Sequence, residues 1–505
     1  MEFVTDMAAK RAELTPGRVA FRDHDNGRSF SFAQVNEAAD RAAHALLAQG
    51  ARAGDRIGIL CHNWPEFFIL LFACQKAELI LVPLNWRQPA PELAPIVAMA
   101  SIRVLVHDAA HAAVARQLGE AAPLNRIALD HSDDGTPTLA QLLAAAPASP
   151  AGSGRRKSSD VWYLLFTSGT TGTPKAVIQT FAMAWANHVS IGQAIDLTSA
   201  DTSVNFLPLF HTAGINLHTL PVFLAGGMSH FVRRFEPDVL FALIEQGAVS
   251  AFFGVPAVYQ AFSLHPRFAR ADLSRVRTWG CGGAPLPRPL FDVFAARGVC
   301  TRLGYGMTET GPTVFLSDEA VSAAKPGSIG KPQMLTEVRL ADPAGRVIEG
   351  AGTGEVQMRG PNITPGYMWN EAATRDTFTR DGWLRSGDVG SRDADGDYFI
   401  VDRLKDMFIS GGENVYAAQV ERVLHSHPQV LEAAVIGIAD AKWGEVGHAF
   451  LLPRPGEAID LASLPSWCRE RTAAYMIPKR FEIIAEFPRT AAGKVQKHVL
   501  KARLK

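Results

Sequence analysis

The feature of this sequence that most constrains its fold is an apolar run that ends abruptly in a loop of hydroxyl and glycine residues. Residues 161–166 have the length and composition of a buried strand. The loop consists of Thr167, Ser168, Gly169, Thr170, Thr171, Gly172 and Thr173, followed by Pro174 and Lys175. Its glycines allow a tight turn in which N–H groups, hydroxyls and the lysine face one anion. The pattern predicts a phosphate-binding loop without Walker spacing; a Ser/Thr/Gly linker is the alternative.

The size and charge of the chain describe a globular protein with more than one domain. The chain has 505 residues, which is more than a domain with a single hydrophobic core usually contains. Fifty basic and fifty acidic side chains cancel, which argues against nucleic-acid partners and against a polybasic membrane surface. The five cysteines have no close pair and no metal-ligand spacing, which favours a reducing compartment. The N-terminus has no signal-peptide pattern, and the longest apolar run, residues 67–74, is too short to span a bilayer. We therefore expect a cytoplasmic protein without an integral membrane segment.

Helix and strand patterns alternate along most of the chain. Ser31 and Gln34 form a capping box that predicts the start of an amphipathic helix. Short apolar strands are expected at 56–61 and 79–84, with a buried helix at 65–77 between them. This alternation predicts a layered α/β fold with largely parallel sheets. Because several later strands also end in polar or glycine-rich loops, we expect those loops to meet at the carboxyl edge of a sheet.

The character of the sequence changes close to residue 402. Two apolar stretches flank the charged segment 402–406, and short strands with two helices follow it. We therefore place a domain boundary there. Residues 1–402 are expected to form a large N-terminal portion, and residues 403–505 a small C-terminal α+β domain.

Several motifs that follow predicted strands carry chemistry suited to a nucleotide. Tyr305 can stack on a planar ring, Thr308 can bind phosphate, and Glu309 can hold a magnesium ion. Asp388, after a tight turn, offers a carboxylate to a pair of hydroxyls. Taken alone, each has an ordinary alternative: a hydrogen-bonded turn, a turn aspartate, a structural histidine at His211, or a solvent-facing lysine in the C-terminal loop.

Taken together, these motifs resemble those of the adenylate-forming enzymes, which include acyl-CoA synthetases, aryl-CoA ligases, firefly luciferase and peptide-synthetase adenylation domains. The matching segments are 168–175, 282–285, 305–309, 382–388, 403–416 and 488–495, in the family's order. Three departures stand out: Ala176 replaces a common glycine, Ala417 replaces a common proline, and Ile477 stands where some aryl-CoA ligases have an arginine. The family fold is a large α/β portion followed by a small mobile C-terminal domain.

The resemblance implies an ATP-dependent carboxylate–CoA ligase that works in two steps. A carboxylate attacks the α-phosphate of Mg-ATP, giving an acyl-adenylate and pyrophosphate; the thiol of CoA then displaces AMP and forms the thioester. The implied partners are a small carboxylic acid, ATP, Mg²⁺ and CoA, with the protein a monomer or homodimer. Because one site cannot offer a catalytic lysine and a CoA tunnel at once, the small domain is expected to rotate about Lys405 between the steps.

The resemblance also implies roles for individual residues. The catalytic residues are Lys494, Thr308 and Glu309, and Glu309 is also the metal ligand. The ATP and AMP contacts are Thr167, Ser168, Gly169, Thr170, Thr171, Gly172, Lys175, Gly283, Ala284, Tyr305, Gly306, Asp388 and Arg403. The acyl pocket consists of His211, Ala213, Phe253, Gly282, Gly304 and Met307. The CoA contacts are Gly411, Gly412, Trp443 and Lys479.

The acid is less well defined than the reaction type. The expected pocket walls are mostly apolar or small, which suits a medium- or long-chain fatty acid or an aromatic acid, with fatty acids slightly favoured. No unassigned arginine is aimed at a second carboxylate, which disfavours malonate. Three alternative functions stay open: an amino-acid or aryl-acid adenylating enzyme without CoA, a luciferase-like oxygenase, and a non-catalytic nucleotide-binding protein.

Overall fold

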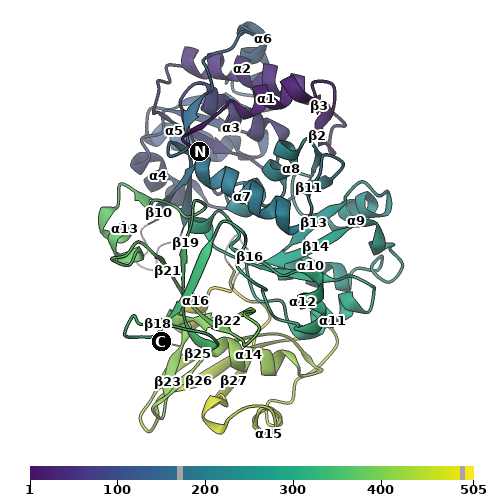
Figure 1. The fold of residues 1–505 in the computed structure, drawn as a ribbon, viewed down its shortest axis with the longest axis vertical. Coiled ribbons are helices and arrows are strands. Elements are labelled where there is room, and N and C mark those ends of the chain that lie inside the picture. Colours follow the sequence, from purple (N-terminus) through teal and green to yellow (C-terminus); the bar gives the residue numbers. More distant parts are fainter. Residues whose placement is uncertain (168–173, 490–494, 505) are drawn as a thin grey trace.

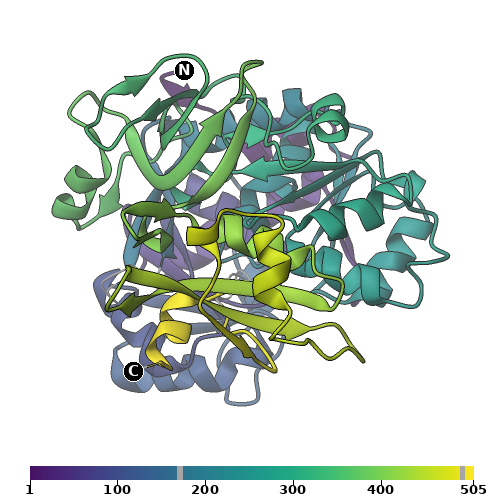
Figure 2. The same ribbon diagram turned by 90° about the horizontal axis from the view of Figure 1, so that it is seen from below.

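The computed structural model describes residues 1–167, 174–489 and 495–504. The described residues form two large sheets, a five-stranded antiparallel sheet and a five-stranded C-terminal sheet (Figure 1). In addition, β1 (Phe3–Val4) and β8 (Arg156–Lys157) form a separate two-stranded sheet. Figure 2, a view from below, shows the C-terminal elements in front of the rest of the molecule. The predicted combination of a layered α/β portion and a small α+β unit is confirmed.

The first large sheet carries the predicted phosphate loop at one of its strands. Its order is β20 (Tyr367–Met368), β10 (Lys175–Thr180), β9 (Val161–Thr167), β5 (Ile80–Pro83), β4 (Arg56–Leu60), β6 (Val104–His107) and β7 (Asn125–Ala128). The strands from β9 to β7 run parallel, whereas β10 and β20 pair antiparallel. The carboxyl ends of the parallel strands therefore lie at one edge, as predicted.

The second large sheet carries the predicted acyl-pocket and adenine residues. Its order is β16 (Phe315–Leu316), β15 (Thr301–Tyr305), β14 (Thr278–Gly282), β13 (Ala251–Gly254), β11 (Thr202–Asn205), β12 (Met228–Phe231), β2 (Val19–Asp23) and β3 (Ser29–Ser31). The six central strands are parallel, and the two edge strands are antiparallel. Strands β14 and β15 place Gly282 opposite Gly304.

The helices cover the faces of the sheets, and α3 (Pro65–Lys76) lies between the two large sheets. They are α1 (Met7–Leu14), α2 (Phe32–Ala48), α3 (Pro65–Lys76), α4 (Ala90–Met99), α5 (Ala112–Ala121), α6 (Leu139–Ala145), α7 (Phe181–Ala194), α8 (Thr219–Ala225), α9 (Pro237–Glu245), α10 (Pro256–Leu264), α11 (Arg288–Ala295), α12 (Glu319–Ala324), α13 (Glu371–Thr377), α14 (Ala417–His425), α15 (Leu464–Arg469) and α16 (Lys497–Ala502). The predicted capping box is present, since Ser31 and Gln34 exchange hydrogen bonds at the start of α2.

Helix α3 is buried at every position because it lies between the two large sheets. The Phe68 ring packs against Phe21 of β2, with centroids 5.6 Å apart, and Phe72 packs against Trp162 of β9, with centroids 6.2 Å apart. Its one cation, Lys76, is buried and paired with Asp6 and Asp40 at 2.6 and 3.1 Å. Because α3 is covered by a sheet on both sides, it has no face that needs polar side chains for contact with water.

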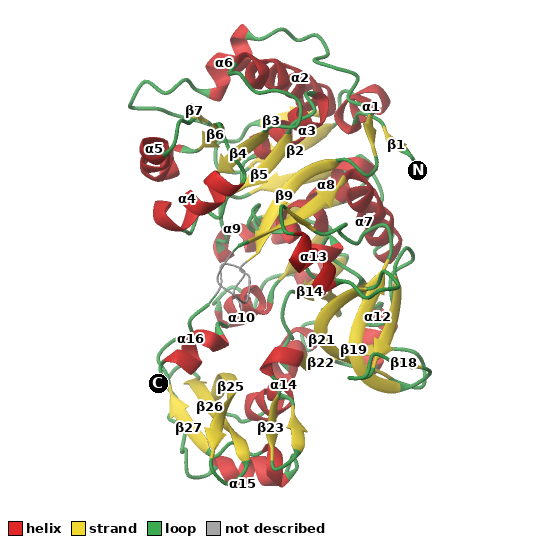
Figure 3. Ribbon diagram, turned by 90° about the vertical axis from the view of Figure 1, so that its left-hand side faces the viewer, coloured by secondary structure: helices red, strands yellow, loops and turns green. Residues whose placement is uncertain are grey.

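The remaining strands form two sheets that meet at the predicted boundary. The antiparallel sheet contains β18 (Val347–Ile348), β17 (Glu337–Ala341), β19 (Gly352–Arg359), β21 (Leu384–Arg392) and β22 (Tyr398–Arg403). The C-terminal sheet contains β24 (Glu413–Val415), β23 (Phe408–Ser410), β26 (Gly444–Pro453), β25 (Val430–Asp440) and β27 (Arg480–Ile483). Helices α14 and α16 pack against β25 (Figure 3). The division into residues 1–402 and 403–505 stays a prediction; the last residue of β22 is Arg403.

Two further sequence features have structural counterparts. All five cysteines are free thiols, and burial raises the pKa of Cys74 and of Cys281 above the ordinary value. Among the described residues, no helix is both long enough and apolar enough to cross a bilayer.

Candidate active site

The base of the predicted phosphate loop is held by two antiparallel strands. Thr167 at the end of β9 pairs with Lys175 at the start of β10. The loop residues Ser168, Gly169, Thr170, Thr171 and Gly172 lie outside the described residues. The ammonium of Lys175 lies 4.8 Å from the ring centroid of Tyr367 on β20, within range of a cation–π interaction. A positive charge is thus positioned at the rim of this loop.

Three predicted nucleotide contacts meet although they come from three strands. The hydroxyl of Tyr305, the last residue of β15, donates a 2.7 Å hydrogen bond to Asp388 Oδ2 on β21. Arg403 Nε on β22 lies 3.5 Å from Asp388 Oδ1. Burial raises the pKa of Tyr305, so the phenol stays protonated and remains a donor. The structure therefore brings together a flat ring, a carboxylate and a cation.

The predicted metal ligand Glu309 is buried beside the same strand end. Its Oε1 accepts a 2.8 Å hydrogen bond from the hydroxyl of Tyr367. The backbone is held as well: Gln179 donates to the carbonyl of Thr308, and Thr364 N–H donates to the carbonyl of Glu309. Tyr367 thus contacts both Lys175 and Glu309. No motif in the sequence marked it, because its role depends on pairing between β20 and β10.

The glycines beside these residues are required by close backbone approach. A Cβ on Gly306 would lie 1.9 Å from the carbonyl oxygen of Pro312, and one on Gly282 would lie 2.7 Å from the carbonyl oxygen of Gly304. Gly283 has a φ of +81°, which a side chain disfavours. Ala284 follows in a turn after β14. Gly282 and Gly306 therefore let backbone segments lie directly against each other, and Gly283 permits the turn that follows β14.

Part of the predicted acyl pocket is assembled around one phenyl ring. A Cβ added to Gly282 would lie 2.9 Å from the Phe253 ring, and one added to Gly304 would lie 3.4 Å from it. Phe253 also lines a cavity together with Val204, Asn205, Leu207, Ala213, Gly214, Leu217, His218 and Thr219. Met307 packs against the core of the second large sheet. The sequence did not indicate His218, a buried histidine within an otherwise apolar helical stretch.

His211 lies just before this cavity lining. It follows Phe210, and the ring centroids of the two side chains are 4.6 Å apart. The backbone N–H of His211 donates to the carbonyl of Pro208. The next segment is a π-helical turn, Ala213–Leu217, a wide turn that recurs at functional sites. A Cβ on Gly214 would lie 2.4 Å from the carbonyl oxygen of Pro208, so the turn folds directly onto the segment before it.

The predicted CoA contacts gather in the C-terminal sheet. Gly411 and Gly412 have φ values of +61° and +90°, and a Cβ on Gly411 would lie 2.8 Å from the indole of Trp443. The Gly411 N–H donates to the carbonyl of Trp443, whose side chain is 40% exposed. Backbone N–H bonds, aided by the charge of Lys479, lower the pKa of Asp440 beside Trp443. Lys405 lies in a short turn after β22. Lys494 lies outside the described residues.

Two further clusters have metal-ligand chemistry, and the acidic groups of both are paired with other groups of the protein. His62, Asp108 and His111 offer ligand atoms within 4.8 Å of one another. Asp108, however, already accepts hydrogen bonds from His111 Nδ1 at 2.5 Å, from the His62 N–H at 2.8 Å and from the Trp64 indole at 3.2 Å. The second cluster surrounds the ammonium of Lys325, which lies within 2.7 Å of Asp393, Asp395 and Asp397.

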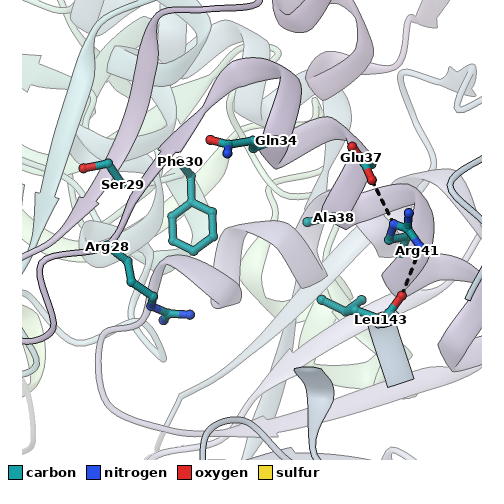
Figure 4. A pocket seen from close by; sticks show the side chains of 8 residues that line it. All are labelled: Arg28, Ser29, Phe30, Gln34, Glu37, Ala38, Arg41 and Leu143. Carbon is teal, nitrogen blue, oxygen red and sulfur yellow. Dashed lines mark hydrogen bonds and ion pairs between the residues drawn. The ribbon is translucent and has the colours of Figure 1, made fainter. Parts of the chain in front are cut away.

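A broad surface hollow is lined by other residues than the predicted site. Figure 4 shows its lining: Arg28, Ser29, Phe30, Gln34, Glu37, Ala38, Arg41 and Leu143. Arg41 is paired with Glu37 at 3.0 Å and donates to the carbonyl of Leu143 at 3.3 Å. The chemistry that gathers at Tyr305, Glu309 and Asp388 is absent from this lining.

The chain matches two families over most of its length. Residues 8–368 match the AMP-binding enzyme family, and residues 419–494 match the AMP-binding enzyme C-terminal domain. The chain belongs to the AMP-binding enzyme family.

Full-length relatives and a solved structure agree with this assignment. The chain is 40% identical to a feruloyl-CoA synthase from an Amycolatopsis species, covering 98% of this chain and 97% of that protein. It is 34% identical to the long-chain-fatty-acid–CoA ligase FadD13 from Mycobacterium tuberculosis, covering 98% and 97%. It resembles the o-succinylbenzoate CoA synthetase MenE from Bacillus subtilis, solved with ATP and a magnesium ion, with a TM-score of 0.88 and 30% identity over 99% of this chain and 100% of that chain.

This member of the AMP-binding family is an AMP-forming acid–CoA ligase that works through an acyl-adenylate. It uses ATP and Mg²⁺, with CoA as co-substrate. The described residues fit these groups. Asp388 and Tyr305 form a polar and flat surface for a nucleoside, and Glu309 presents a buried carboxylate, an oxygen ligand of the kind that Mg²⁺ prefers.

Proposed function

We propose that this enzyme activates an aromatic carboxylic acid, with arylpropenoic acids such as hydroxycinnamates as the main class. The observation that carries the proposal is the small size of the cavity at Ala213 and Phe253. Its volume is about 10 Å³, which is room for about one water molecule. A long alkyl chain needs a continuing channel, whereas an aromatic ring with a short substituent does not. The higher identity to the feruloyl-CoA synthase than to the fatty-acid ligase supports the same choice.

We propose the following division of roles in the first step. The phosphate loop with Lys175 binds the triphosphate, Tyr305 stacks on the adenine, and Asp388 accepts hydrogen bonds from the ribose. Mg²⁺, when bound at Glu309, supplies positive charge to the phosphate oxygens. Lys494 places its ammonium where negative charge develops as the carboxylate attacks, so catalysis consists mainly of positioning and charge stabilisation.

In the second step, we propose that the thiol of CoA reaches the acyl-adenylate along the C-terminal sheet. Gly411 and Gly412 leave room for the pantetheine arm, Trp443 offers an exposed face to the CoA nucleotide, and Lys479 offers a charge to its phosphates. Rotation about Lys405 exchanges Lys494 for these residues at the acyl-adenylate. We also propose a cytoplasmic location, which the free thiols support.

A panel of acids tests the proposed substrate class. We expect hydroxycinnamates and cinnamate to give CoA-dependent AMP formation with kcat/KM at least about 100-fold above that of palmitate, a difference of about 3 kcal/mol in transition-state binding. The panel should include benzoates, octanoate and dodecanoate, with AMP measured with and without CoA. A higher kcat/KM for dodecanoate or palmitate than for every aromatic acid would refute the aromatic class and leave the ligase class unaffected.

Tyr367→Phe tests the metal side of the site. The Tyr367 hydroxyl holds Glu309 Oε1 at 2.8 Å, and without it that carboxylate loses a buried partner. We expect the apparent KM for Mg-ATP to rise roughly 10-fold, since a hydrogen bond to a charged group contributes about 1.5–3 kcal/mol. Pyrophosphate release measured at varied Mg-ATP checks this. Tyr475→Phe, at an exposed tyrosine, is the control. Equal KM values in both variants would show that Tyr367 does not position Glu309.

A further inference from the structure

A buried histidine with no role in the reaction described above lines a cavity at the predicted acyl pocket. His218 lines it together with Ala213 and Phe253, two residues of the predicted acyl pocket. It is 8% exposed, and its ring stands edge-on to Phe253, with centroids 6.1 Å apart and planes at 87°. His218 ends the π-helical turn Ala213–Leu217 and precedes α8, so the pocket wall and this side chain belong to one local segment.

The other polar side chains of the cavity are already paired with one another. The amide of Asn205 donates to the carbonyl of Gly214 at 2.8 Å and to the hydroxyl of Thr219 at 2.7 Å. Its carbonyl oxygen accepts a 2.6 Å hydrogen bond from Asn63. These groups complete their own hydrogen bonds within the protein, which leaves His218 as the polar lining residue to consider for a ligand.

The imidazole of His218 can offer a ligand one hydrogen-bond acceptor. Burial lowers its pKa to about 4, so the ring is neutral at neutral pH, with one N–H donor and one acceptor nitrogen. The nearby charges of Asp201 and Arg277 act on the ring in opposite directions. The backbone carbonyl of Ala251 favours the protonated ring, so we assign the N–H to the nitrogen that faces this carbonyl. The other nitrogen is then an acceptor, and it suits a ligand group that donates.

The size of the cavity limits which ligand substituents can reach His218. Its volume of about 10 Å³ fits one water molecule, and hence a hydroxyl or an amino group. We propose that His218 accepts a hydrogen bond from a hydroxyl or amino substituent on the ring of the aromatic acid, and so selects hydroxyaryl or aminoaryl acids over unsubstituted ones. This inference rests on the proposed function, because it requires an aromatic ring against Ala213 and Phe253.

The proposal makes a prediction for the wild-type enzyme that needs no variant. Among cinnamates with one substituent at ring position 3 or 4, the hydroxy and amino acids are expected to have kcat/KM about 10- to 100-fold above cinnamate in at least one position. The methoxy acids, which accept but cannot donate, are expected to show no such gain. Equal gains for methoxy and hydroxy substituents would overturn the proposal.

Variants at position 218 assign the selectivity to this residue. His218→Leu is expected to bring the hydroxy-to-unsubstituted ratio of kcat/KM close to 1 while cinnamate itself is still activated, and His218→Gln, which keeps an acceptor, should restore part of the ratio. His230→Leu is the matched control, because His230 is also buried, also has a pKa lowered by burial to about 4, and lies on β12 outside the cavity lining. An unchanged ratio in His218→Leu would overturn the role of His218.

The two proposals fail in different ways. If the enzyme activates aromatic acids with the same efficiency whatever their substituent, His218 does not select and the aromatic class stands. If it activates fatty acids and no aromatic acid, the aromatic class fails and the role of His218 fails with it.

Discussion

Replacing Lys494 by alanine is expected to abolish acyl-adenylate formation while largely sparing thioester formation from supplied acyl-adenylate and CoA. In the first step negative charge builds up between the attacking carboxylate and the α-phosphate, and loss of a group that stabilises such charge costs about 10²- to 10³-fold in rate or more. In the second step, the proposed rotation about Lys405 has moved this lysine away from the acyl-adenylate, so its loss should matter little. Pyrophosphate release measures the first half-reaction, and thioester formation from synthetic acyl-adenylate measures the second.

The matched control is Lys501→Ala, at an exposed lysine on the helix that follows the loop. It should leave both half-reactions near wild type. Equal loss of both half-reactions in Lys494→Ala would contradict the use of two domain orientations. Preserved adenylation in that variant would instead remove Lys494 from the catalytic residues.

Replacing Lys497 by methionine is expected to destabilise the C-terminal unit strongly. Lys497 Nζ lies 2.7 Å from Glu421 Oε1, and both side chains are less than one-fifth exposed. Glu421 also accepts the Val435 N–H at 2.8 Å, and Asp402 accepts the Ala418 N–H at 3.0 Å. Although burial opposes its charge, these two carboxylates raise the pKa of Lys497. Removing the cation takes the ion-pair partner from Glu421 and leaves Arg422 as the remaining positive charge that acts on both carboxylates, at a cost of about 3–4 kcal/mol.

Hydrogen exchange reports this loss where it occurs. Amides of α14 and β25 should exchange roughly 10²- to 10³-fold faster in Lys497→Met, as about 3–4 kcal/mol requires. Lys497→Arg, which keeps the charge, and Lys501→Met, on the same helix, are the controls. Unchanged exchange in Lys497→Met would show that the ion pair adds little to stability.

The stability of the Lys497→Met variant should increase as pH falls. Burial raises the pKa of Asp402, whereas the charge of Lys497 opposes that rise. Without the lysine, Asp402 binds a proton more readily in the folded than in the unfolded state, so the stability of the variant rises as pH falls toward the ordinary carboxyl range. Protection factors of the same amides, which correct for the intrinsic pH dependence of exchange, measure this. Protection factors that do not change with pH would contradict this account.

Much of the catalytic chemistry could be predicted from the sequence because it lies in short local segments. The strand at 161–167 and the Tyr305–Glu309 segment each carry a recognisable local pattern of residues. Apolar runs, glycines and hydroxyls therefore indicate them directly, and the resemblance to one enzyme family then joins them. The resemblance also implied the pairing of Asp388 with the nucleotide, which spacing alone could not.

Other features required long-range pairing. Tyr367 contacts Lys175 and Glu309 because β20 pairs with β10, a strand from a much earlier part of the chain, and no short-range pattern links the two. His218 looks like any histidine in an apolar helix until β13 places Phe253 and Ala251 against it. The choice between fatty and aromatic acids was open for the same reason, since it depends on where a pocket ends.

The layered fold follows from strand periodicity and turn chemistry, which are properties of neighbouring residues, whereas the class of reaction follows from the resemblance of the motifs and their order to one enzyme family. Only the tertiary structure decided which side chains from distant strands meet: Tyr305 with Asp388, Tyr367 with Glu309, and His218 with Phe253. The physical reason is that hydrogen bonds and packing act over a few ångströms, and it is the pairing of strands that brings residues far apart in the chain within that range.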